Sequence, residues 1–271
     1  MTRSGKLSRQ RVHVEGIGPG RRNVNESRRL RGKISVAVLD MTLVRVCALL
    51  AGVFALAAAA GNDRMAPLSQ YLMSPQAEIA LARDAAPAAI SKRATILVLG
   101  AHGYAVARKG QNGFTCIVER GWMQPFGAPN FWSVKVRAPI CYNAAAARTV
   151  LVYTFKRTEM VLAGASKSQI QDRIVAGIRA NALPTPEPSS MAYMMSKSQY
   201  LNDDGKAWYP HVMIFTPMAD SADAGASWGA DRRLSPVVFD ARDKMPEPWT
   251  CFFIPVAHWS DGTPARLYSG T

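Results

Sequence analysis

The sequence predicts an α+β fold, in which an antiparallel sheet is covered by helices. Short β-branched runs separated by Gly and Asn-Gly turns indicate a three-strand meander, and three or four further strands follow a proline-rich linker. Between these two groups lie two segments with the caps and the apolar periodicity of helices. Together with one earlier helix, this order of elements is typical of the α+β class.

The run Met41–Ala60 is expected to be a signal peptide. Arg45 supplies a positive start, and the fifteen residues Val46–Ala60 carry no charge. This length suits a signal sequence and is shorter than the roughly 20 residues that cross a bilayer. The run ends in four alanines, so cleavage is expected near Ala59 or Ala60 and the protein is expected in the periplasm or secreted. A buried core helix or an uncleaved anchor is the alternative.

Residues 1–40 contain ten Lys or Arg and three Asp or Glu, with few apolar side chains. Such a segment cannot bury enough surface to offset its ordering entropy, so we expect disorder. We favour a misassigned extension, with translation starting at Met41, over a nucleic-acid-binding arm.

Residues 61–271, expected to form a single domain, hold 22 basic and 16 acidic residues without runs. A domain that binds nucleic acid would carry a clustered basic stripe. We therefore do not expect nucleic acid to be a partner of this domain.

The first helix is expected to open at Ser74-Pro75, a capping hydroxyl followed by proline, and to run through Ala77–Ala86. The predicted meander comprises Thr95–Leu99, Tyr104–Arg108 and Phe114–Arg120. In its third strand, alternation places Cys116 and Val118 on one face and Ile117 and Glu119 on the other. Residues 121–140 are expected to form a loop.

Two helices are expected next, paired as an αα-hairpin. Asn143 can cap a helix through Ala144–Ala163, although Val150–Tyr153 would also suit a strand. Ser166 and Gln169 form a capping box before a second amphipathic helix. The later strands, after the linker Leu183–Ser190, are Met191–Met195, His211–Thr216, Val237–Phe239 and Trp249–Trp259, with Pro255 marking a bulge or a strand end.

Three cysteines follow the signal peptide. Cys116 and Cys141 flank a proline-rich loop, and in an oxidising compartment we expect them to pair. The bridge would contribute roughly 3 kcal/mol in the chain-entropy model. Cys251 would then be the free thiol. Because no C-x-x-C pair exists, thioredoxin chemistry and a cysteine zinc knuckle are unsupported, and no cofactor is predicted.

Five short segments resemble a group of exported proteobacterial proteins of unknown function. They are GFTCIVER at 113–120, APICYN at 138–143, MAYMMS at 191–196, WYPH at 208–211 and GASWG at 225–229. The resemblance spans residues 70–264, and it implies one domain and a start near Met41. It implies no activity, ligand or catalytic residue.

The sharpest enzyme hypothesis is a Cys251 nucleophile with His211 as its base and Asp240 orienting the imidazole. His258 is on the same predicted strand as Cys251 and lies about 23 Å from it if the strand stays straight, which is too far for contact. Ser227 is the other nucleophile candidate, in a G-x-S-x-G pattern that no helix follows. The alternative interpretation of Cys251 is a core residue, because free cysteines are commonly buried.

A metal site is a weaker hypothesis, and none is predicted. His211 with Met194, Met195 and Met213 could present soft ligands for copper. The aspartates that could bind calcium in loops are Asp203, Asp204, Asp220 and Asp223. Strand methionines more often fill cores, and Asp-Gly pairs are ordinary turns.

Aromatic loop residues suggest a binding cleft, with Trp122, Trp132, Trp208 and Trp228 as its walls and Arg120 to receive an acidic group. The alternative is that Trp122 and Trp132 cap the core. The favoured function is an exported binding or envelope-interaction domain, whose partner is a small molecule, a glycan or an envelope protein. It would meet the membrane only during export. The alternative is a hydrolase using Cys251 or Ser227 with His211.

Overall fold

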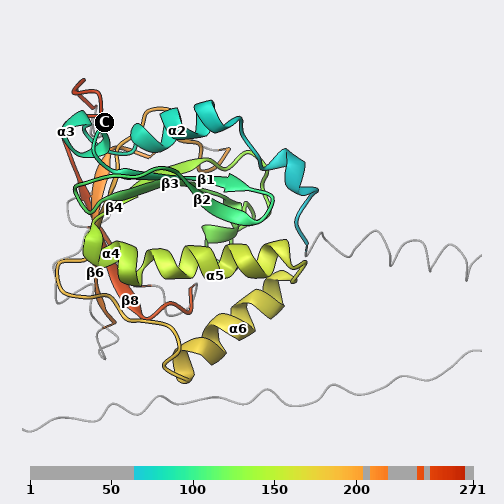
Figure 1. Ribbon diagram of the computed structural model, residues 1–271. Helices are drawn as coiled ribbons and strands as arrows, with labels where there is room; N and C mark the ends of the chain where they lie inside the picture. The colour runs from blue at the N-terminus through green and yellow to red at the C-terminus, as the bar shows by residue number, and fades with distance from the viewer. Residues whose placement is uncertain (1–63, 204–207, 219–236, 241–244, 266–271) are drawn as a thin grey trace, which may run out of the picture. The chain divides into compact units, whose positions relative to one another are not determined.

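The computed structural model describes residues 64–203, 208–218, 237–240 and 245–265 (Figure 1). The predicted signal peptide and residues 1–40 lie outside these ranges, as do Ser227 and Trp228. In the described ranges, no helix is both long enough and apolar enough to cross a membrane.

In the described ranges, the helical elements comprise two 3-10 turns and five α-helices. They are η1 (Leu68–Gln70), α2 (Pro75–Arg83), α3 (Ala88–Ser91), η2 (Gly121–Met123), α4 (Ala144–Thr149), α5 (Leu151–Leu162) and α6 (Lys167–Arg179). The strands are β1 (Thr95–Gly100), β2 (Gly103–Arg108), β3 (Thr115–Glu119), β4 (Ala138–Tyr142), β5 (Met191–Met194), β6 (His211–Pro217), β7 (Val237–Asp240) and β8 (Trp249–Pro255).

The strands form one sheet in the order β2-β1-β3-β4-β5-β6-β8-β7. Every neighbouring pair is antiparallel except β1 and β3, which are parallel. The α+β class is therefore confirmed, but the first three strands are not a meander. The segment after β2 passes back across the start of β1, where Gln111 N donates to Arg93 O and Gly110 N donates to Thr95 Oγ1. Strand β3 thus pairs with β1 rather than with β2.

Strand β4 lies where the sequence predicted the end of a loop and a helix cap. All five of its residues are buried, although Pro139 cannot donate to a ladder and so weakens the sequence signal for a strand. Pro139 lies opposite Val118 of β3. The last strand is shorter than the predicted Trp249–Trp259 and ends at Pro255, so of the two predicted roles Pro255 takes that of a strand end, because proline has no N–H with which to continue the pairing.

One face of the sheet is covered by α2, which contacts β1, β3 and β4. Ser74 caps this helix by accepting from Ala77 N, as predicted. The buried residues between helix and sheet are mostly small, and they are Ala82, Ala85, Ala86, Ala94, Ile96, Cys116, Val118 and Cys141. Small side chains allow a close approach, so this layer is thin.

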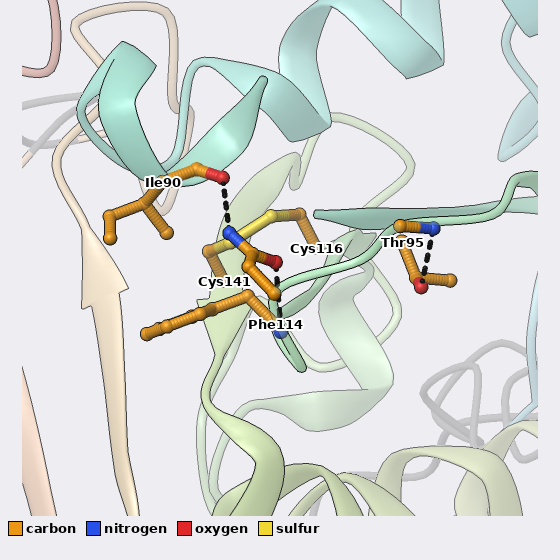
Figure 2. The surroundings of a disulfide bond; sticks show 7 residues. Ile90, Thr95, Phe114, Cys116 and Cys141 are labelled. Carbon is orange, nitrogen blue, oxygen red and sulfur yellow. Dashed lines mark hydrogen bonds between the residues drawn. A yellow bond between two sulfur atoms is a disulfide. The ribbon is translucent and has the colours of Figure 1, made fainter. Parts of the chain in front are cut away.

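The predicted disulfide is present on this face, where Cys116 of β3 lies directly opposite Cys141 of β4 (Figure 2). Both cysteines are fully buried. The loop before β3 is anchored by Asn112, whose Nδ2 donates to Ile90 O over 2.8 Å and whose Oδ1 accepts from Phe114 N. The disulfide therefore joins two neighbouring strands in the middle of the sheet.

The opposite face carries the predicted helix pair, and Figure 1 shows α2 and α5 on opposite sides of the sheet. The expected single helix 144–163 is divided at Val150 into α4, which contacts β4 and β5, and α5, which contacts β2. Helix α6 packs on α5 and begins with the predicted capping box of Ser166 and Gln169. Gly164 ends α5 with a φ of 78°, which favours glycine.

Candidate binding site

A cavity of about 240 Å³ lies on the helical face of the sheet, over β4, β5, β6 and β8. It exists because the helices do not cover the whole face. Helices α4 and α5 lie against β2, β4 and β5, whereas the floor formed by β6 and β8 is bordered by loop residues such as Gln124 and Trp208. The sheet is wider than the helix pair, and the cavity lies over the strands that the helices leave partly uncovered.

The lining of this cavity is mainly apolar. Four methionines of the described residues contribute to it, and they are Met123, Met194, Met213 and Met245. The aromatic side chains are Tyr142, Trp208, Phe215, Trp249 and Phe253. Unbranched, polarisable methionine side chains adapt to ligands of different shapes. The described lining contains no Lys or Arg, so it offers no cationic group to a bound anion.

His211, the first residue of β6, is the one histidine in the described lining, and it is fully buried. It lies on the same face of the strand as Met213 and Phe215, which also line the cavity. Its Nδ1 lies 2.9 Å from Tyr209 O. A carbonyl only accepts, so Nδ1 carries the proton and Nε2 is the acceptor. Burial lowers the pKa of His211 to about 4, which keeps the ring uncharged at neutral pH.

Glu119, the last residue of β3, brings a carboxyl group to the same cavity. Its Oε1 accepts from Tyr142 Oη over 2.7 Å and from Thr154 Oγ1 of α5 over 2.6 Å. Burial raises the pKa of Glu119, and the two hydrogen bonds oppose that rise because they stabilise the charged form. Glu119 and His211 thus bring a buried carboxyl group and a buried imidazole to the cavity, on strands that are three positions apart in the sheet.

The strand register separates the predicted nucleophile from its predicted base. Cys251 lies opposite Phe215, whereas His211 lies opposite Pro255. Four residues of extended strand span about 13 Å, which is far beyond hydrogen-bond reach. Burial also raises the pKa of the Cys251 thiol, which lowers its reactivity. Asp240 pairs with Thr250 on the side of β8 away from β6, so the backbone does not bring it beside His211.

Of the predicted aromatic residues, the three that the structure describes, Trp122, Trp132 and Trp208, are not gathered at one cleft. Trp122 is fully buried in the core, and its Nε1 donates to Thr158 Oγ1 over 3.0 Å. Trp132 packs against that core and meets the ring of Phe131 edge-on. Trp208 borders the cavity with 40% of its surface exposed, and its ring lies 5.6 Å from that of Phe253. Trp208 is therefore the predicted binding aromatic that the structure places at the cavity.

Arg120 has a partner inside the protein instead of facing a ligand. Its Nη2 lies 2.9 Å from Glu78 Oε2 of α2, and both side chains are buried. The guanidinium also donates to the carbonyls of Tyr71 and Val118, and Glu78 Oε1 accepts from Leu99 N over 3.1 Å. The ion pair fills the region where β1 leaves β3 after Ile96, and this explains why a charged residue is buried at the end of β3.

The soft-metal hypothesis is only partly matched by geometry. Met194 lies directly opposite His211, and Met213 lies two residues along β6, so all three line the cavity. Met195 follows the end of β5, and its backbone N–H donates to Ala85 O. In the part of the chain that the structure describes, no three His, Cys, Asp or Glu side chains gather as metal ligands would. Asp204, Asp220 and Asp223 lie outside that part.

The residues that sequence reasoning missed are those that build the cavity from several elements: Glu119, Met123, Gln124, Tyr142, Thr154 and Met245. One signal was available. Strand alternation places Glu119 on the face of Ile117, and a carboxyl group on a buried face is unusual enough to indicate a site. Thr154 and Met245 have no comparable local signal, because they reach the cavity through tertiary packing.

No protein-family model, curated protein or solved structure matches this chain. The resemblance to exported proteobacterial proteins accordingly stays a prediction.

Proposed function

We propose that this protein is exported and that its domain binds a small, largely apolar molecule in the cavity over β4, β5, β6 and β8. The observation that carries the proposal is the cavity itself, about 240 Å³ lined mainly by methionine and aromatic side chains. Ligand sites are commonly concave and apolar, with a few convergent polar groups. Here those polar groups are Glu119 and His211.

The volume limits the size of the ligand. A dry apolar cavity of roughly 150 Å³ accommodates benzene. By proportion, 240 Å³ suits a molecule of roughly ten non-hydrogen atoms. This size favours a bicyclic aromatic or short aliphatic compound over a glycan chain or a long lipid.

Two features support export. The run Met41–Ala60 has the length and the small-residue end of a signal peptide. The disulfide between Cys116 and Cys141 is of the kind that forms and persists in oxidising compartments. Mass spectrometry of the protein from its native host is expected to find an N-terminus near Gly61. Detection of the intact residue 1 in the folded, oxidised protein would contradict export.

Binding can be tested with 1-methylnaphthalene, an uncharged probe of suitable size. Equilibrium dialysis with the mature protein is expected to show saturable binding of one molecule per chain. Ala138 lines the cavity and is buried, so Ala138→Phe should fill part of the space and abolish saturable binding. Ala105 is exposed on β2, and Ala105→Phe is the matched control that should bind normally. Absence of saturable binding to the unmodified protein would overturn the proposal.

A further inference from the structure

His211 presents a hydrogen-bond acceptor that the protein does not satisfy. Its Nδ1 proton is used by Tyr209 O, and its Nε2, on a fully buried ring, has no hydrogen-bond partner among the described residues. Leaving a buried polar atom unpaired is costly, and such atoms in native proteins call for an explanation. A group from outside the chain that donates a proton to Nε2 would remove this cost.

The neighbours of the imidazole do not supply that proton. The rings of Trp208 and Tyr209, which carry donor groups, lie 6.0 and 5.9 Å from the imidazole between centroids, yet Nε2 accepts no hydrogen bond from the described residues. Met194 lies directly across from His211 on β5, and Met213 is the next residue on the same face of β6; thioether sulfurs accept only weakly and donate nothing. The Phe253 ring, 5.2 Å away between centroids, also has no polar hydrogen to donate. The acceptor therefore lies in an apolar wall of the cavity.

The charges around the cavity restrict the ligand further. The described lining holds no Lys or Arg, and its one carboxyl group, Glu119, already accepts two hydrogen bonds. His211 stays uncharged at neutral pH, because burial disfavours the imidazolium and lowers its pKa to about 4. An anionic ligand would lose its hydration without gaining a counter-charge, so the site should exclude it.

We propose that the ligand is an uncharged, mainly apolar molecule with one hydroxyl or N–H group, and that His211 Nε2 accepts the hydrogen bond from that group. This inference rests on the proposed binding function and adds the chemical class of the ligand. His211 is in this view the residue that determines specificity, while the methionines and aromatic side chains supply the apolar contact.

The test compares 1-naphthol with 1-methylnaphthalene, which have the same rings and substituents of similar size. The methyl compound is the more hydrophobic of the two, so burial alone predicts that it binds more tightly. A hydrogen bond to Nε2 reverses that order, and the unmodified protein is expected to bind 1-naphthol about tenfold more tightly in equilibrium dialysis. 1-Naphthoate, an anion at pH 7.5, is expected not to bind measurably.

Two variants assign the preference to His211. The preference is expressed as the dissociation constant of 1-methylnaphthalene divided by that of 1-naphthol, which cancels changes in cavity shape that both ligands share. His211→Phe should reduce this ratio by at least tenfold, because the hydrogen bond is lost and burial alone favours the methyl compound. Met213→Leu alters the same wall without removing the acceptor, and the preference for 1-naphthol should persist. Circular dichroism and thermal unfolding check that each variant is folded. If a variant does not fold, the comparison of the two ligands on the unmodified protein still tests the inference.

The outcomes separate this inference from the proposed function. If neither naphthalene compound binds, the proposed function fails. If both bind to the unmodified protein and 1-naphthol has no advantage, the cavity is a ligand site but His211 does not select a donor, and the inference fails alone. Binding of 1-naphthoate as tight as that of 1-naphthol would contradict the inference that the ligand is uncharged. An unchanged preference for 1-naphthol in folded His211→Phe would contradict the role of His211 as the acceptor.

Discussion

The buried ion pair on the α2 face and the cavity on the opposite face differ in how their polar groups are paired. Glu119 and Arg120 are neighbours in the chain, and the extended backbone sends them to different faces. On the α2 face, Arg120 meets Glu78 and two backbone carbonyls. On the other face, Glu119 shares a cavity with His211, whose Nε2 has no partner in the described part of the chain. The Arg120 guanidinium is thus paired within the protein, whereas the Nε2 acceptor of His211 is left for a ligand.

The difference follows from what covers each face. Helix α2 lies directly on β1, β3 and β4 through small side chains, so polar groups there must be paired within the protein. On the other face α5 meets β8 through Tyr153 and Trp249, whose rings lie edge-on at 4.8 Å between centroids, and loop residues border the remaining space over β6 and β8. We therefore expect substitutions on the α2 face to change mainly stability, and substitutions in the cavity to change mainly binding.

The largest expected effect is at the buried ion pair of Arg120 and Glu78. Arg120→Met leaves the Glu78 carboxylate buried without its partner, and it should lower the unfolding free energy by about 3–5 kcal/mol. Urea denaturation measures the change. The double variant Glu78→Met/Arg120→Met should lose less than Arg120→Met alone, because it leaves no unpaired charge. Lys156→Met, in the exposed pair with Glu159, is the control that should leave stability unchanged; an equal effect at both sites would contradict the assignment.

The next effect concerns the disulfide, whose cysteines are 25 positions apart in sequence. The variant Cys116→Ala/Cys141→Ala should lose about 3 kcal/mol, because the unfolded chain regains the freedom that the bridge removes. A reductant should destabilise the natural protein in urea but leave this variant unaffected. If the reductant acts equally on both, the bridge does not supply the stability.

A smaller effect is expected from the pH dependence of His211. In the unfolded chain its pKa is about 6.5, and in the folded protein burial lowers the pKa to about 4. Between these values only the unfolded state binds the proton, so the unfolding free energy should fall as the pH is lowered from 6.5 towards 4. The loss from this group is about 2–3 kcal/mol at pH 4.5.

The measurement for this prediction is urea denaturation at pH 7.5 and pH 4.5 for the natural protein and for His211→Phe. Glu119, whose pKa is raised, acts in the opposite direction, but it is present in both proteins and cancels in the comparison. The natural protein should therefore lose more stability than the variant. Equal losses would show that His211 titrates normally in the folded state.

The smallest expected effect is at Cys251, where the cavity face carries a free, buried thiol. Burial raises its pKa, and only the thiolate is alkylated at an appreciable rate. Iodoacetamide at pH 8 should leave it unmodified in the folded protein and modify it fully in urea, as followed by mass spectrometry. Rapid alkylation in the folded state would restore the nucleophile hypothesis.

Local patterns were sufficient for most of the elements. Ser74, Asn143 and the Ser166–Gln169 capping box each mark the start of a helix, because a cap is made by residues within one turn. The order of helices and strands likewise gave the fold class. By contrast, β4 was hidden by Pro139, and the parallel pairing of β1 with β3 depends on the path of the chain after β2, which no local pattern specifies.

The sequence by itself determined the class of fold, the helix caps and the identity of the two paired cysteines, because each depends on composition or on neighbours in the chain. Tertiary structure alone decided the site. It buried Arg120 against Glu78, placed Cys251 about 13 Å along the sheet from His211, and opened a cavity where the helix pair ends. These are consequences of register and of layer width, and both are set by contacts between residues that are distant in the chain.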